Sequence, residues 1–117
     1  MANPVEKGFE IQNDVLVRYN GSEAEVVIPE GVTEVGESAF SWNFNLTSVT
    51  IPVGIKKIDK AAFQCCFKLT SVTIPDSVQE IGADAFSDCP NLTLFGSEGS
   101  IAEAYAKECH IPFLADE

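Results

Sequence analysis

An interval of 23 residues recurs along the chain and constrains the fold more than any other feature of the sequence. Ile-Pro pairs begin at Ile28, Ile51 and Ile74, each 23 residues after the one before. Other apolar columns keep the same interval: Val32, Ile55 and Val78; Val35, Ile58 and Ile81; Phe40, Phe63 and Phe86, each after an Ala; Leu46, Leu69 and Leu92. A period of about 20 to 29 residues is typical of leucine-rich repeats. We therefore predict three 23-residue repeats.

Each repeat contains the elements of one coil. Residues Leu46–Ile51 alternate apolar and polar side chains and predict a short strand, which Pro52 ends because proline cannot donate to a sheet. Ile55 and Ile58 predict a second extended piece, and Ala62-Phe63 a helical turn. One coil cannot bury its own apolar side, but stacked coils bury a continuous core. The predicted fold class is an α/β solenoid, a right-handed leucine-rich repeat with short parallel strands.

Both ends of such a solenoid must be covered. Two apolar runs, Phe9–Ile11 and Val15–Val17, flank a turn-rich spacer and predict a β-hairpin over the first coil. The first strand of the repeats should then run from Glu25 to Ile28. The sequence predicts one domain over residues 1–117, with the N-terminal cap and first strand in 9–27, the three repeats in 28–95, and a capping helix and tail in 96–117.

The C-terminal cap has a clear helix signal. Ser100 and Glu103 form a capping box, so a helix should begin there and continue through Cys109. Helical periodicity predicts that it packs on the last coil through Ile101, Ala104 and Tyr105, with Cys109 a candidate for the same face. The segment Ile111-Pro112-Phe113 should return as a final extended piece.

Several segments resemble the BspA-like leucine-rich repeat family of bacterial surface and secreted proteins. They are VIPEGVTEVGESAF, LTSVTIPVGIKKIDKAAF, LTSVTIPDSVQEIGADAFSDCPNL and the closing GSIAEAYAKECHIPF. The resemblance extends from Phe9 to Phe113. It implies a non-catalytic protein-binding or adhesion module at a bacterial cell surface or after secretion, with a host or extracellular protein as the expected kind of partner. The alternative is a structural spacer or terminal fragment of a longer surface protein, with no ligand of its own.

The charge balance excludes two classes of partner. Lys and Arg total 7 against 18 Asp and Glu, which gives a net charge of -11. Nucleic acid and anionic lipid both need a basic face, so neither is an expected partner, and no apolar run is long enough to insert into a membrane. The first ten residues, MANPVEKGFE, contain no apolar core of a signal peptide. The residues alone therefore predict a cytoplasmic chain or one whose leader has been removed, and the resemblance favours the surface or secretion.

Signals for catalysis, cofactors and metals are weak. His110 is the only histidine and is expected at the end of the capping helix, far from the coils. The chain has no CxxC pair and no glycine-rich phosphate loop. We therefore predict no catalytic residue, no cofactor and no metal site, and we do not expect the protein to be an enzyme.

Three polar positions share one column in the loop of each repeat, namely Asn43, Cys66 and Cys89. One hypothesis is that these are small side chains buried under the loop. The other is a disulfide between Cys66 and Cys89, because neighbouring coils lie about 4.8 Å apart. The redox state of the cysteines stays open at this stage. The lysines of the second repeat have two interpretations as well: Lys57 either pairs with Glu34 and Glu80 across the coils or contributes to an anion site.

Two surfaces could bind a protein. The first is the outward face of the main sheet, expected to present Glu25, Val27, Ser48, Thr50, Ser71, Thr73 and Leu94. Its area of about 300 Å² is well below the roughly 800 Å² per partner of a standard interface, so this face alone would bind weakly. The second is the loop edge, where Trp42 and Phe44 align with Cys65 and Phe67 of the next repeat. These aromatics either pack into the core or form an exposed patch for a partner or for weak self-association.

Overall fold

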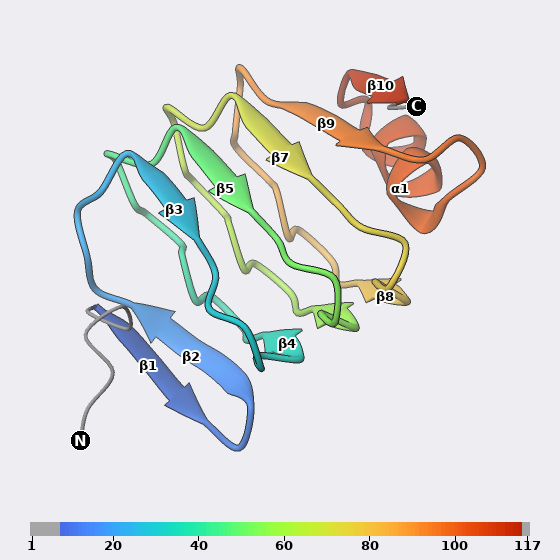
Figure 1. The fold of residues 1–117 in the computed structure, drawn as a ribbon. Helices are drawn as coiled ribbons and strands as arrows, with labels where there is room; N and C mark the ends of the chain where they lie inside the picture. The colour runs from blue at the N-terminus through green and yellow to red at the C-terminus, as the bar shows by residue number, and fades with distance from the viewer. Residues whose placement is uncertain (1–7, 116–117) are drawn as a thin grey trace.

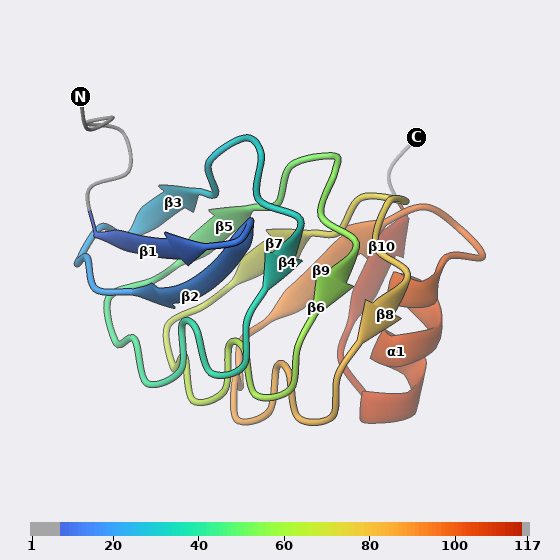
Figure 2. The same ribbon diagram turned by 90° about the horizontal axis from the view of Figure 1, so that it is seen from below.

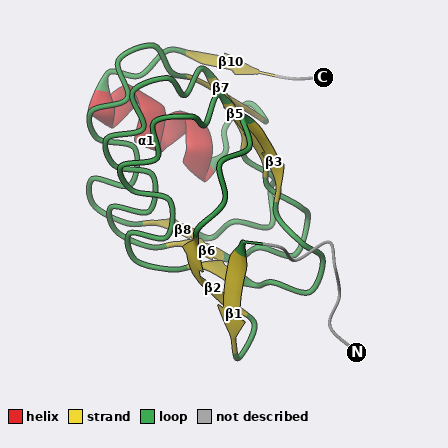
Figure 3. Cartoon of the chain, turned by 90° about the vertical axis from the view of Figure 1, so that its left-hand side faces the viewer, coloured by secondary structure: helices red, strands yellow, loops and turns green. Residues whose placement is uncertain are grey.

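The computed structural model describes residues 8–115, which form a solenoid of stacked coils (Figure 1). Its elements are β1 (Phe9–Gln12), β2 (Val15–Tyr19), β3 (Glu25–Val27), β4 (Glu34–Val35), β5 (Ser48–Thr50), β6 (Lys57–Ile58), β7 (Ser71–Thr73), β8 (Glu80–Ile81), β9 (Thr93–Gly96), α1 (Ile101–Cys109) and β10 (Phe113–Ala115). They make two five-stranded sheets, in the orders β1-β2-β4-β6-β8 and β10-β9-β7-β5-β3. Figure 2 and Figure 3 show the two sheets on different sides of the coils.

Each coil adds one strand to each sheet, in register with the sequence period. In one sheet Val26 pairs with Val49 and Val49 with Val72, all parallel. In the other, Val35 pairs with Ile58 and Ile58 with Ile81, again parallel. These pairs confirm the predicted stack of coils with short parallel strands.

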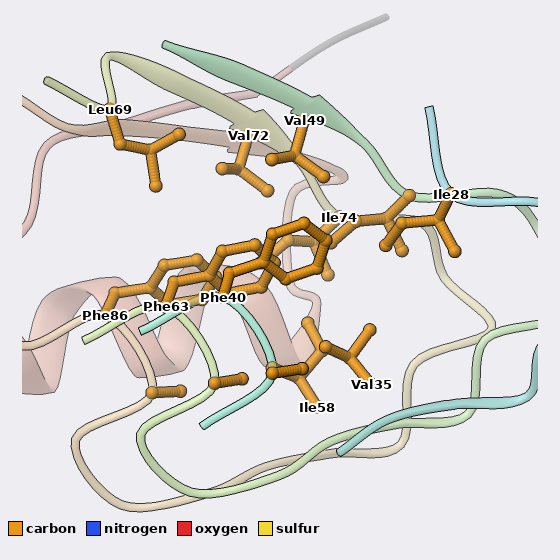
Figure 4. Packing of buried hydrophobic residues seen from close by; sticks show 14 of the residues in the cluster. Ile28, Val35, Phe40, Val49, Ile58, Phe63, Leu69, Val72, Ile74 and Phe86 are labelled. Atoms are coloured by element: carbon orange, nitrogen blue, oxygen red, sulfur yellow. The ribbon is translucent and has the colours of Figure 1, made fainter. Parts of the chain in front are cut away.

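The interior is a continuous column of aromatic rings (Figure 4). The rings of Phe40 and Phe63 are stacked with centroids 4.8 Å apart, and those of Phe63 and Phe86 with centroids 5.0 Å apart. All three side chains are buried, with at most 2% exposed. The predicted Phe column is therefore the core of the molecule, because each ring covers the face of the next.

The N-terminal hairpin closes one end of this column, as predicted. β1 and β2 pair antiparallel, and β2 continues the sheet of β4, where Leu16 lies opposite Val35. The ring of Tyr19 lies 5.3 Å from that of Phe40, and Phe9 packs on Tyr19 at 4.8 Å. The hairpin thus supplies a strand to one sheet and two rings to the core.

The C-terminal helix has the predicted ends, but a different face packs on the core. The Ser100 hydroxyl accepts from the backbone N–H of Glu103, and the Glu103 carboxylate accepts from the N–H of Gly99. The buried residues are Ala102 and Ala106, whereas Ile101, Ala104 and Cys109 are exposed and Tyr105 is half-buried. The prediction is confirmed for Tyr105, which packs against Phe86, and was wrong for the three exposed residues. The small side chains of Ala102 and Ala106 are the buried ones instead, and the Ala102 Cβ lies beside Gly96.

Tyr105 replaces the coil that is missing after the third repeat. Within the stack, the N–H of Phe40 donates to the carbonyl of Ala62, and that of Phe63 to Ala85. The N–H of Phe86 donates instead to the Tyr105 hydroxyl, at 3.2 Å. The Tyr105 ring also packs edge-on against Phe86, with centroids 5.9 Å apart. One side chain therefore satisfies the last backbone donor and covers the last ring. The predicted final extended piece is β10, which pairs parallel with β9.

Replacing Tyr105 with phenylalanine should lower the free energy of unfolding by about 1–2 kcal/mol, because the N–H of Phe86 loses its acceptor while the ring remains. Urea unfolding followed by circular dichroism measures the change. The matched control is Tyr19→Phe, since the Tyr19 hydroxyl accepts only a longer bond of 3.4 Å from the N–H of Glu23. An equal loss in both variants would show that the Tyr105 hydroxyl has no special role at this end.

Candidate protein-binding surfaces

The face of the main sheet presents most of the side chains predicted for it. Glu25, Val27, Thr50 and Thr73 are exposed, and Ser48 and Ser71 are half-buried. All of them lie on β3, β5 and β7, where residues paired across the strands occupy the same face. The face is flat and mostly polar, with small hydroxyl side chains on its inner strands.

Leu94 does not belong to this face, and its prediction was wrong. The 23-residue interval places Leu94 beside Ser71, but β9 pairs one residue out of that interval, with Leu94 opposite Val72 and Thr93 opposite Ser71. A shift of one residue moves a strand's side chains to the opposite faces of the sheet. Leu94 is therefore fully buried, and Thr93 and Phe95 occupy the outward positions.

The loop edge carries an exposed aromatic cluster, made of Trp42, Phe44 and Phe67. Their side chains are 58%, 53% and 42% exposed, so the hypothesis that the two Phe residues pack into the core is wrong. Phe44 and Phe67 stack with centroids 5.6 Å apart, and Trp42 meets both rings edge-on at 6.2 and 6.1 Å. The three rings support one another on the surface. Cys65, which aligns with Trp42 in the sequence, is buried instead.

Backbone geometry holds the cluster in place. Trp42 has a left-handed conformation with φ of 63°, as do Cys65 and Asp88 in the same column. This conformation is unusual for a bulky side chain. The N–H of Trp42 donates to the carbonyl of Gln64, and the Asn43 side chain accepts from two backbone N–H groups of the following turn, those of Asn45 and Leu46. In the third repeat Asp88 and Pro90 take the aromatic positions, so the cluster is confined to the first two.

The cysteines of the loop column are free thiols under the loop. The Cys66 thiol lies 3.1 Å from the carbonyl of Phe40, and the Cys89 thiol 3.1 Å from that of Phe63. The hydrogen bond between the two thiols, together with burial, raises the pKa of Cys66, and the same bond lowers the pKa of Cys89. All four cysteines lie within the described residues, and none forms a disulfide. The structure thus supports the first of the two hypotheses.

The lysine of the second repeat pairs with an acidic neighbour. Lys57 lies 4.0 Å from Glu80 on the next coil; the Lys57 side chain is partly exposed and that of Glu80 largely so. Glu34 lies on the preceding coil. Its pKa is raised, mainly by desolvation and secondly by a hydrogen bond with Asp59. Exposed pairs of this kind contribute about 0–1 kcal/mol, so the column stabilises the stack only slightly.

One cleft contains residues that the sequence did not predict to lie close together. It has a volume of about 470 Å³ and lies between the third repeat and the end of α1, with Asp84, Cys89, Tyr105 and His110 among its lining residues. The expectation that His110 lies far from the coils was wrong. Within residues 8–115, no three His, Cys, Asp or Glu side chains come together in a way that could hold a metal ion.

The repeats match one family of known proteins. The family model described as the BspA type leucine rich repeat region matches residues 11–108, in six copies. The chain belongs to the BspA-type leucine-rich repeat family. Its stacked coils are therefore a leucine-rich repeat solenoid of this family, as the sequence segments predicted. Comparison with curated proteins gave no match.

Several solved structures of leucine-rich repeat proteins from bacteria are similar to this chain. A leucine rich cell surface protein of Faecalibacterium prausnitzii is 31% identical over 74% of this chain, with a TM-score of 0.66. Leucine-rich repeat proteins of Eubacterium ventriosum and Bacteroides ovatus are 27% and 30% identical over 80% and 74% of it, with TM-scores of 0.69 and 0.64. The matched parts make up 27%, 28% and 23% of those chains, so this chain spans about a quarter of their length.

No helix in the described residues of this BspA-type chain is long and apolar enough to cross a membrane. Among these three relatives, the Faecalibacterium protein is described as a cell surface protein.

Proposed function

We propose that this BspA-type domain is a non-catalytic protein-binding or adhesion module of a bacterial surface or secreted protein. The aromatic cluster of Trp42, Phe44 and Phe67 is the observation that carries the proposal. Tryptophan and other large aromatic side chains are enriched among the residues that dominate protein–protein binding energy. The likeness to a leucine rich cell surface protein supports a location outside the cell.

The cluster is suited to a partner because its rings are held before binding. Each ring contacts the other two, and the turn beneath them is fixed by the hydrogen bonds of Asn43. Side chains that are already ordered lose little conformational entropy when a partner covers them. The rings also expose apolar area to water, and burying that area favours association.

The strands of the sheet face follow the cluster closely along the chain. The chain runs from Phe44 into β5 and from Phe67 into β7 within a few residues. The hydroxyl groups of Thr50 and Thr73 lie on those strands and are exposed. A partner centred on the aromatic cluster would therefore meet a polar rim on the sheet, which is the usual composition of an interface. The alternative function, a spacer without a ligand, gives the exposed rings no role.

Photo-cross-linking tests the proposal directly. We expect benzoylphenylalanine at position 42 to cross-link a partner protein on the producing bacterium or its host, and the same group at position 53 to give no such product. Val53 is the matched position, because it is 83% exposed and lies in another loop. Cross-linking to a second copy of the chain would assign the cluster to self-association, and no product at position 42 would favour the spacer.

The double substitution of Trp42 and Phe44 by serine should weaken binding of that partner about 30-fold or more, because the loss of one hot-spot side chain costs about 2 kcal/mol or more and the contributions of neighbouring side chains do not simply add. Biolayer interferometry with the captured partner gives the dissociation constant. Val53→Ser, which removes a more exposed apolar side chain, should leave it unchanged. Equal affinities for the double variant and the unchanged protein, with both folded by circular dichroism, would rule out the cluster as the binding site.

A further inference from the structure

The N-terminal hairpin covers one sheet of the solenoid and leaves the other open. β1 and β2 continue the sheet that contains β4, β6 and β8. In the second sheet β3 is the outermost strand at this end, as Figure 1 shows. Each strand between β10 and β3 is paired on both sides. Among residues 8–115, strand β3 therefore has no partner on this edge, where the inner strands have a neighbouring coil.

The backbone groups on this edge can be identified from the register. The N–H of Ile28 donates to the carbonyl of Thr50, and the N–H of Ser48 donates to the carbonyl of Ala24. In a parallel pair, the groups of every second residue point to the same neighbour. Val26 therefore also faces β5, and the N–H and C=O groups of Glu25 and Val27 point away from the sheet. They form a template for one more strand.

The open edge adjoins a groove with polar and acidic walls. The groove has a volume of about 520 Å³, and Tyr19, Gly21, Glu23 and Glu25 line it together with Val27. Gly21 fits there because a Cβ atom would collide with the Tyr19 ring. Glu23 and Glu25 are both exposed. The described residues that line the groove thus include two carboxylates and no basic side chain.

The outward side chains of β3 differ from those of the inner strands. Ser48 and Ser71 stand in the column of Glu25, and Thr50 and Thr73 in that of Val27. On the edge strand these positions are a carboxylate and an aliphatic side chain that is 66% exposed. A strand added here would therefore meet a negative charge at one position and an apolar side chain two residues further along.

The charge of the molecule decides between the occupants of this edge. A second copy would bring another chain of net charge -11 and its own Glu25 against the same edge. Like charges facing one another destabilise a strand pair. A segment with Lys or Arg beside Glu25 gains attraction instead, both locally and from the field of the whole domain.

We propose that the free edge of β3 binds an extended basic segment of a partner protein, which adds to the sheet as a further strand. Backbone hydrogen bonds to Glu25 and Val27 supply the pairing, a Lys or Arg side chain pairs with Glu25 or Glu23, and an apolar side chain covers Val27. The aromatic cluster takes no part in this interaction, so the proposal is independent of the function assigned to it.

A peptide of alternating lysine and valine residues is the probe. We expect its titration to shift the backbone amide signals of residues 19–27 in NMR spectra. The variant Val27→Pro removes the N–H that points to the open edge, at a position where a proline fits an edge strand. Binding should weaken at least about tenfold, because one hydrogen bond is lost and the ring blocks the approach. Val27→Thr is the matched control, since it keeps the N–H and has the side chain of the inner strands; its affinity should stay within about threefold of the unchanged protein.

A modified peptide and further variants distinguish strand addition from charge attraction alone and from pairing with a second copy. The same peptide with N-methyl groups on alternate amides keeps its charge and loses its donors, and it should not bind; this arm holds even where Val27→Pro fails to fold. Glu25→Lys should weaken binding of the unmodified peptide.

Equal binding of both peptides, or of Val27→Pro and the unchanged protein, would overturn strand addition. A dimer in sedimentation velocity that Val27→Pro abolishes would assign the edge to a second copy and overturn the proposal. The aromatic double variant should bind the peptide normally, so a failure here leaves the cluster's role unaffected.

Discussion

Replacing Phe63 with alanine should lower the free energy of unfolding by about 3–5 kcal/mol, the typical cost of removing a buried Phe ring. Phe63 is fully buried and stacks on Phe40 on one side and Phe86 on the other. Alanine would leave a cavity in the middle of the aromatic column, and coils on both sides would lose contacts. Since small domains are stable by only about 5–15 kcal/mol, the variant should lose a large part of its stability.

The same repeat provides the control. Phe67 lies four residues further along, is 42% exposed and packs only on the surface aromatic cluster. Phe67→Ala should cost less than about 1 kcal/mol, because the Phe67 side chain is 42% exposed and lies outside the buried core. Urea unfolding of both variants, followed by near- and far-ultraviolet circular dichroism, gives the comparison. Similar losses in the two would mean that the stacked column is not the main source of stability.

The period of the sequence was enough to predict the coils, because every coil repeats the same packing problem. The columns of Ile, Val and Phe had to point inward for stacked coils to share one core, and they do. The ends were predictable from local signals: the alternation and turn of the hairpin, and the capping box of Ser100 and Glu103. These signals act within a few residues and do not depend on the rest of the fold.

The 23-residue period gave a wrong prediction at the C-terminal end of the repeats. Extended to β9, it places Leu94 on the outer face, but β9 pairs with β7 one residue out of step. The apolar character of Leu94 was the available signal, since Val49 and Val72 on the inner face are apolar and Ser71 on the outer face is not. The helix face failed for a related reason. Periodicity favoured the larger side chains of Ile101 and Tyr105; Tyr105 does pack on Phe86, but Ala102, which lies beside Gly96, is buried in place of Ile101.

The candidate site was only half predictable. The sequence showed that Trp42, Phe44 and Phe67 would lie on one edge of the coils, because their positions repeat at the same interval. It did not show which way they point, since a Phe suits the core and a binding surface equally well. The left-handed backbone of Trp42 and the local turn fixed by Asn43 set the direction, and the hydrogen bond from the N–H of Trp42 to the carbonyl of Gln64 forms only when the coils are stacked. The open edge of β3 was hidden for the same reason: it depends on which sheet the hairpin joins.

Cys66 should react with a thiol reagent about a thousandfold more slowly than Cys109 in the native protein. Cys109 is exposed, whereas Cys66 is fully buried and Cys65 nearly so. A buried thiol reacts only when the surrounding structure opens, and opening of a stable core costs several kcal/mol. The reactive form of a cysteine is the thiolate. Burial raises the pKa of the Cys65 thiol, and interaction with Cys89 raises the pKa of the Cys66 thiol, so the thiolate form of each is disfavoured. Cys89 is half-buried with a lowered pKa and should react at an intermediate rate.

Timed labelling with iodoacetamide, followed by peptide mass spectrometry, resolves the cysteines. In concentrated denaturant all four should react at similar rates, which shows that the fold causes the difference. Cys109→Ser should remove the fast reaction and leave the slow ones unchanged. Modification of Cys66 as fast as Cys109 would contradict a closed stack of coils. Recovery of a Cys66–Cys89 disulfide from protein purified without reductant would show that these two thiols, which occupy the same column of neighbouring coils, serve as a cross-link and not as core side chains.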